Sequence, residues 1–112
     1  MREIKFRAWQ DNQMLTSPIS SNYGLSRFFA LLYEDAKLMQ YTGLTDKNGV
    51  EVFEGDILKC DGLRIVIQYS GCAFEGRYLG PQKDLWSPIR NNNYLQWVVI
   101  GNIHQNPELL KP

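Results

Sequence analysis

The first hydrophobic pattern along the chain is an alternation with a period of two. Ile4, Phe6 and Ala8 occupy one side of the opening segment, and mostly charged residues fill the positions between them. Successive side chains of a strand point to opposite faces, so residues 2–9 are predicted to form a strand whose charged face lies in solvent. Trp9 falls among the charged positions, which places it at an edge or on the surface of the predicted sheet.

The next part of the chain changes from this alternation to a helical spacing. Turn-forming residues at 11–13 and a short return strand at 14–15 come first. Residues 25–35 then carry the i, i+3, i+4, i+7 spacing of an amphipathic helix, with Ser26 placed to cap its start. The segment is short for a helix and its aromatic residues suit a strand equally well, so both assignments stay open.

From residue 37 onward, strand-like segments alternate with tight turns. Asn-Gly at 48–49 and Asp-Gly at 61–62 are strong hairpin signals, because these residues tolerate the positive φ angles of two-residue turns. Residues 81–93, with two prolines and three consecutive asparagines, are predicted to form a loop, and residues 106–108 begin a single helical turn. Strands are predicted at 37–44, 50–53, 57–60, 63–69, 73–79 and 96–103.

This succession of short strands and turns favours a mainly β fold. We expect a small barrel or meander in the C-terminal half, with an N-terminal strand and one short helix packed on it. An α+β fold is the alternative. The 112 residues fit a single domain spanning 1–112, and a hydrophobic content of 44% suffices for a core.

The charge balance and the cysteine content indicate which partners the protein suits and in which compartment it resides. Twelve basic and twelve acidic residues leave no net charge, which disfavours a protein that binds nucleic acid through phosphate contacts alone. The charged N-terminus is unlike a signal peptide, and no apolar run approaches the roughly 18 residues of a membrane helix. Cys60 and Cys72 fit no metal or redox motif and are interpreted as idle thiols. We therefore expect a cytoplasmic protein.

Three groups of residues could form chemical sites. Residues 46–49 resemble part of a calcium loop, but glycine stands fourth instead of sixth, so a turn is favoured. His104, the sole histidine, has no supporting spacing to either cysteine. A metal or acid–base site is conceivable at three acidic residues, but a solvated hairpin edge is favoured: Glu51, Glu54 and Asp56. We therefore expect no catalytic residue, metal or cofactor, and no enzymatic activity.

Aromatic and arginine side chains provide the remaining candidates for binding. Such residues can stack on nucleic-acid bases, although in a β-rich chain most aromatic side chains belong to the core. Arg7, Trp9 and Trp86 are the candidate binding residues, and an apolar surface near Trp86 would suit a protein partner.

Three segments together carry a family resemblance: residues 1–9, 38–57 and 99–110. The central segment contains Tyr-Thr-Gly at 41–43 and Glu-Gly-Asp at 54–56. With these motifs, the chain resembles the YopX family of bacteriophage and prophage proteins. The resemblance implies a mostly β fold, a phage or prophage origin and residence in the bacterial host cytoplasm, without an assigned activity. The two tripeptides therefore transfer as markers of the fold only.

These observations lead to a functional hypothesis. We expect an accessory protein that binds a protein partner or associates with itself, without catalysis and without a membrane. A small barrel that binds nucleic acid is the alternative hypothesis.

Overall fold

The computed structural model describes residues 5–16, 32, 34–70, 73–80, 86–88 and 96–110, and these residues form two antiparallel sheets. The first sheet has the order β2-β1-β3-β4, with β1 at Phe6–Gln10, β2 at Gln13–Thr16, β3 at Lys37–Thr45 and β4 at Glu51–Phe53. The second has the order β8-β7-β6-β5-β9, with β5 at Asp56–Cys60, β6 at Leu63–Ser70, β7 at Ala73–Tyr78, β8 at Trp86–Pro88 and β9 at Val98–Asn102. A 3-10 turn, η2 at Pro107–Leu110, follows.

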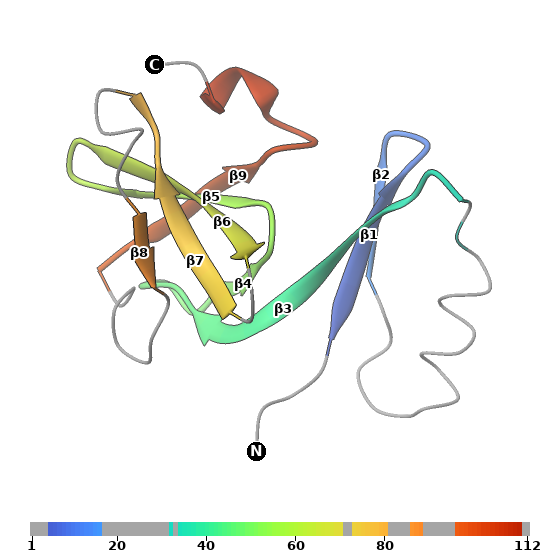
Figure 1. Cartoon of the computed structure of the whole chain (residues 1–112), viewed down its shortest axis with the longest axis horizontal. Helices are drawn as coiled ribbons and strands as arrows, with labels where there is room; N and C mark the ends of the chain where they lie inside the picture. Colours follow the sequence, from blue (N-terminus) through green and yellow to red (C-terminus); the bar gives the residue numbers. More distant parts are fainter. Residues whose placement is uncertain are drawn as a thin grey trace.

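The long strand β3 connects the two parts of the molecule. Figure 1 shows β3 running from the β1–β2 hairpin to the curled second sheet, where β4 pairs with its C-terminal half. The mainly β fold with a barrel-like C-terminal half is thereby confirmed.

The predicted hairpin turns are confirmed and follow from residues that tolerate a positive φ. Asp11 and Asn12 have φ angles of 53° and 60° in the turn between β1 and β2. Gly49 has a φ of +81° between β3 and β4, and Asp61 has a φ of 54° between β5 and β6. Each turn therefore has Asp, Asn or Gly where the backbone enters the left-handed region.

The core lies inside the curled second sheet and against β4. Ile65 and Ile67 on β6 are at most 1% exposed, as the alternation along that strand predicts. They pack in a cluster with Val52, Leu58, Phe74 and Trp97.

The predicted orientation of β1 is wrong. Its charged face is covered instead of solvated: Lys5 is only 7% exposed and forms an ion pair with Glu51 of β4, and Arg7 pairs with Asp56 of the second sheet. Ala8, on the other face, is also fully buried. Alternation identifies two faces of a strand, but partners distant in sequence decide which face is covered.

Two further segments refine the sequence predictions. Residues 86–88 form β8 and pair with β7, so the loop predicted at 81–93 is wrong there. Residues 34–35 form a turn, and most of the helix predicted at 25–35 lies outside the described residues. The helical turn predicted at 106–108 is confirmed as η2. Among the residues the structure describes, no helix is long and apolar enough to cross a membrane.

Candidate functional site

Asp46 organises the hairpin between β3 and β4. Its Oδ1 accepts the backbone N–H groups of Asn48 at 2.8 Å and Val50 at 2.9 Å, and its Oδ2 accepts the N–H of Val99 at 2.9 Å. Burial tends to raise the pKa of Asp46, but the three N–H donors outweigh burial and hold this pKa below its ordinary value. Both carboxylate oxygens are thus engaged by the backbone, as the turn interpretation of this segment requires.

Asp56 has a similar role in the turn between β4 and β5. Its Oδ2 accepts the N–H of Phe53 at 2.8 Å, and its Oδ1 lies 2.5 Å from Arg7 Nη2. The guanidinium of Arg7 also stacks 4.6 Å from the centroid of the Phe53 ring. Burial raises the pKa of Asp56 above its ordinary value although the charge of Arg7 opposes this shift.

The prediction of a solvated acidic edge is therefore wrong for Asp56, but not for Glu51, whose side chain is 38% exposed. Asp56 is 2% exposed, and Glu51 binds Lys5 with Nζ and Oε2 2.5 Å apart. Glu51 lies on β4, so its ion pair with Lys5 is formed within the first sheet, whereas Asp56 on β5 attaches Arg7 of β1 to the second sheet.

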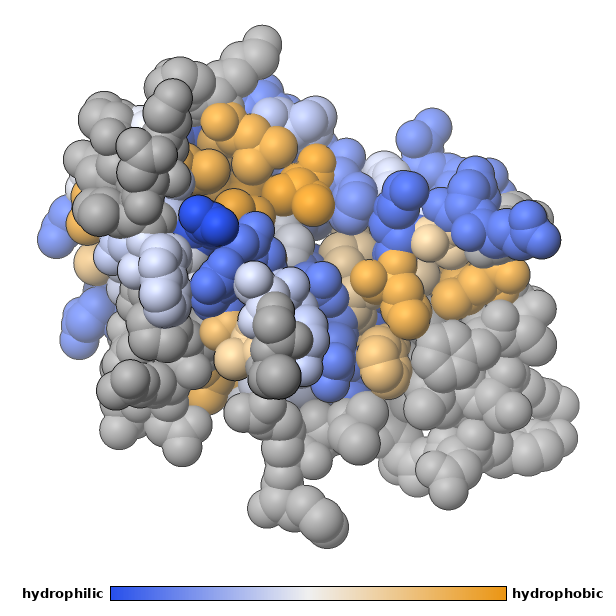
Figure 2. Space-filling model, in the orientation of Figure 1, coloured by the Kyte–Doolittle hydropathy of each residue, from blue (hydrophilic) through white to orange (hydrophobic). Residues whose placement is uncertain are grey.

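A cleft opens between the N-terminal half of β3 and the second sheet. It has a volume of about 490 Å³, within the range of ligand-binding pockets. Leu38 of β3 and Leu110 of η2 line it and are 44% and 38% exposed, and Met39, Val66 and Ile103 supply further apolar surface. Figure 2 shows apolar side chains gathered on both sides of the hollow between the sheets.

Gly55 forms part of this cleft and connects three elements by its backbone. Its N–H donates to Ile67 O at 2.7 Å, and its carbonyl accepts the N–H of Ile103 at 2.9 Å. Gly55 has a φ of +89°, and a Cβ here would lie 3.2 Å from Met39 Sδ. The positive φ therefore favours glycine at this position, and a Cβ would in addition need the Met39 side chain to shift by a few tenths of an ångström.

Trp9 and His104 form another contact between the two parts of the molecule beside the cleft. Their rings are stacked, with centroids 6.1 Å apart and an interplanar angle of 13°. Burial, together with the positive charges of Arg7 and Lys37, lowers the pKa of His104 below its ordinary value. The neutral imidazole is consequently the form that suits this environment.

The comparisons with known proteins agree with this architecture. The family model described as YopX protein matches residues 5–111. The chain belongs to the YopX family. A similar solved structure is that of protein EF1440 from Enterococcus faecalis, with 29% identity, a TM-score of 0.67, and coverage of 99% of this chain and 100% of that one. No curated protein matches the chain.

The two YopX tripeptides have structural explanations. In Glu-Gly-Asp at 54–56, the glycine makes the turn and the aspartate binds Arg7 and the N–H of Phe53. In Tyr-Thr-Gly at 41–43, Thr42 is 1% exposed and its hydroxyl donates to Val52 O at 2.8 Å. Both tripeptides therefore hold β4 in place.

The structure separates the three candidate binding residues of this YopX chain. Arg7 and Trp9 share the face of β1 that points toward the second sheet, where each contacts a residue of that part. Trp86 lies on β8, an edge strand of the second sheet, and is 57% exposed. Their assignment as binding residues stays a prediction.

The other described arginines have intramolecular contacts. Arg64 donates to the carbonyl of Leu109 at 2.7 Å, and Arg77 lies 3.6 Å from Glu75 Oε1. They stand on β6 and β7, away from β1 in the sheet order. Arg90 lies outside the described residues.

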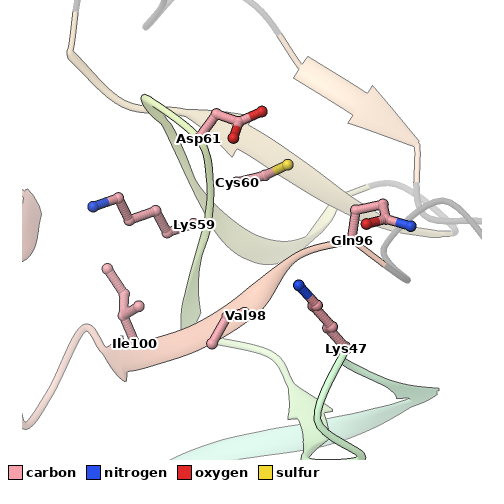
Figure 3. A pocket seen from close by; sticks show the side chains of 7 residues that line it. All are labelled: Lys47, Lys59, Cys60, Asp61, Gln96, Val98 and Ile100. Carbon is pink, nitrogen blue, oxygen red and sulfur yellow. The ribbon is translucent and has the colours of Figure 1, made fainter.

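A second hollow, of about 600 Å³, contains Cys60 but not His104. Figure 3 shows Lys59 pointing away from Cys60, as expected for neighbours on a strand, while Lys47 approaches from the hairpin. Cys60 and His104 thus line different hollows, so the structure does not bring them together as a catalytic pair. Cys72 lies outside the described residues.

Sequence reasoning missed the cleft itself. Leu38 and Leu110 are far apart in the chain and belong to segments whose patterns suggested ordinary strand and turn residues. A signal was nevertheless present, since Leu38 and Met39 are adjacent in a strand and point to opposite faces. Such a pair predicts a strand with apolar contacts on both faces.

Proposed function

We propose that this YopX protein is a non-catalytic accessory protein of a bacteriophage or prophage that binds a protein partner in the cleft. The observation that carries the proposal is that Leu38 and Leu110, two exposed leucines on different elements, both border one cleft. Removing such side chains from water is the main driving force of protein association. Contact with a partner's apolar side chains would therefore stabilise the apolar lining of the cleft more than contact with water does.

The ionisable groups beside the cleft favour binding over catalysis. Asp56 is engaged by Arg7 and a backbone N–H, and the ring of His104 is stacked on Trp9. A general base needs access to a substrate proton, which Asp56, at 2% exposure, does not have. Their geometry accounts for attachment of the sheets, so we propose no reaction.

The arginine contacts also favour a protein partner over nucleic acid. Binding of phosphates requires cations that reach solvent, and affinity grows with the number of phosphates they neutralise. Arg7 and Arg64 instead direct guanidinium nitrogens to Asp56 and to the carbonyl of Leu109. This use of the arginines supports a protein partner.

Quantitative capture from the bacterial host tests the proposal. The tagged chain is compared with a cleft variant, Leu38→Ser with Leu110→Ser, and with a matched control, Tyr69→Ser with Trp86→Ser. The control removes the exposed apolar residues of the second sheet, which are 50% and 57% exposed. All three should fold, which thermal unfolding verifies.

We expect the cleft variant to lose its partner by about tenfold or more, because two leucine contacts are removed, while the control retains it. Light scattering distinguishes self-association from a different partner. Equal capture by the cleft variant, or loss confined to the control, would refute binding in the cleft. Salt-sensitive binding to DNA that exceeds protein capture would support the nucleic-acid hypothesis instead.

A further inference from the structure

One edge of β3 is paired over only part of its length. β3 has nine residues and pairs with β1 through Lys37–Gln40, whereas β4 has three residues and lies against the C-terminal part of β3. Glu54 still donates its N–H to the carbonyl of Gln40 at 2.9 Å. The turn at Gly55, whose N–H donates to Ile67 O of β6, then leads the chain into β5 of the second sheet. Before Gln40, at residues 37–39, this edge of β3 therefore has no neighbouring strand among the described residues.

The register shows which backbone groups this open edge presents. Tyr41 donates its N–H to Lys5 O at 2.9 Å, so Tyr41 directs its backbone groups toward β1. Alternate residues of a strand direct N–H and C=O to opposite edges. The backbone N–H and C=O of Met39 accordingly point toward β1, and those of Leu38 point toward the open edge. Within the described part of the chain, the N–H and C=O of Leu38 have no hydrogen-bond partner.

The cleft lies along this edge, because Leu38 and Met39 belong to its lining together with Val66 and Leu110. An unpaired strand edge is a template for another strand, and main-chain hydrogen bonds of this kind bind extended peptides in several recognition domains. An apolar cleft beside such an edge provides pockets for the side chains of an added strand.

The charged residues on the face of the first sheet that carries Arg7 and Lys37 indicate which kind of strand would be added to β3. Lys5 and Arg7 each have a carboxylate partner, Glu51 and Asp56 respectively. Lys37 is the third cation on this face, is exposed and lines the cleft, and has no carboxylate partner among the described residues. Lys37 is also close enough to His104 for its charge to lower the pKa of that imidazole. An incoming carboxylate would complete the series of ion pairs.

Glu54 is the one carboxylate among the described residues that line the cleft. Its Oε1 accepts the N–H of Gln40 at 3.4 Å, so it caps the point where pairing with β4 ends. It therefore marks one end of the open edge, and Lys37 marks the other.

We propose that an extended acidic segment of a protein partner adds as a strand to β3 at Leu38, with a carboxylate at Lys37 and apolar side chains against Leu38 and Leu110. This proposal rests on the proposed function, because it specifies the partner of the same cleft.

Amide exchange followed by NMR tests strand addition directly. The probes are acetylated eight-residue peptides in which aspartate alternates with valine and threonine, and matched peptides with lysine in place of aspartate. In the free protein, the amide of Leu38 should exchange rapidly and that of Met39 slowly, because only Met39 is bonded to β1. Saturation with the acidic peptide should slow exchange at Leu38 by about tenfold or more.

Two pairs of variants separate the contribution of the Lys37 charge from that of the Leu38 backbone N–H. Lys37→Glu should weaken binding of the acidic peptide by about fivefold or more, whereas the control Lys59→Glu, an exposed lysine of the other hollow, should not. Leu38→Pro removes the outward N–H while the bonds to β1 persist, so it should weaken binding more than Leu38→Ala, which keeps that N–H.

The outcomes distinguish this inference from the proposed function. Strand addition is wrong if the acidic peptide binds without protecting Leu38, if the lysine peptide binds as tightly, or if no peptide binds. Partner capture that still depends on Leu38 and Leu110 would then leave the proposed function intact. If the partner is captured equally well by the variant that lacks Leu38 and Leu110, both strand addition and the proposed function are wrong.

Discussion

Replacing Asp46 by Ala should destabilise the protein strongly, because one carboxylate serves three backbone donors. The N–H groups of Asn48 and Val50 belong to an exposed turn, where water can replace the lost acceptor at a cost of about 1 kcal/mol each. The N–H of Val99 belongs to β9 and should cost about 2 kcal/mol. The free energy of unfolding should therefore fall by about 4 kcal/mol, and the melting midpoint by about 15 °C.

Urea and thermal unfolding followed by circular dichroism measure this change. Asp46→Asn keeps one acceptor oxygen and turns an amide donor toward a remaining N–H, so it should fall between wild type and Asp46→Ala, about 2 kcal/mol below wild type. Asp35→Ala, in an exposed turn, is the control and should stay within about 0.5 kcal/mol. A loss below about 1 kcal/mol in Asp46→Ala would refute the reasoning.

The pH dependence provides a second check on the same carboxylate. The pKa of Asp46 is lowered in the folded protein, so its stabilisation is present above the ordinary value of 3.8 and is lost as pH falls through the folded pKa. The difference in stability between wild type and Asp46→Ala should therefore shrink in acid. If the stability difference between wild type and Asp46→Ala stays constant down to about pH 2, the Asp46 carboxylate does not act as an ionised acceptor.

Three further predictions concern other contacts. Gly49→Val should lower stability by about 1 kcal/mol or more, because valine resists the φ of +81°, and an unchanged melting midpoint would argue against this turn. Asp56→Asn should cost about 3 kcal/mol in urea unfolding because it removes the negative charge that balances the buried Arg7, and the added change Arg7→Met should recover part of it. Wild type should lose stability as pH falls below 6.5, since the pKa of His104 is lowered and the fold favours neutral imidazole; His104→Phe should lack this component of the pH profile.

Much of the fold followed from local patterns. Asn-Gly at 48–49 and Asp-Gly at 61–62 predicted hairpins because positive φ angles depend on the residue itself and its immediate neighbours. The alternation along β6 predicted its buried positions, because adjacent side chains of a strand always point to opposite faces. The YopX segments predicted the family, since they extend over both ends of the chain.

The candidate site was less accessible to such reasoning. The sequence predicts a loop at Trp86 because prolines lie nearby. In the structure, Trp86 lies on the short strand β8, which pairs with β7. Leu38 gave no sign that its strand would lack a neighbour on one edge. That property depends on the turn at Gly55, which leads the chain into β5 of the second sheet before β4 can cover the rest of β3.

The sequence by itself thus determined the strands, their turns and the family, because each depends on residues close together in the chain or on a shared pattern. Only the tertiary structure decided that the charged face of β1 is covered and that Asp56 is a buried partner of Arg7. It also decided that a cleft lies along an open strand edge. The physical reason is that burial, ion pairing and edge pairing depend on segments separated by tens of residues, and the chain places these together only when both sheets have formed.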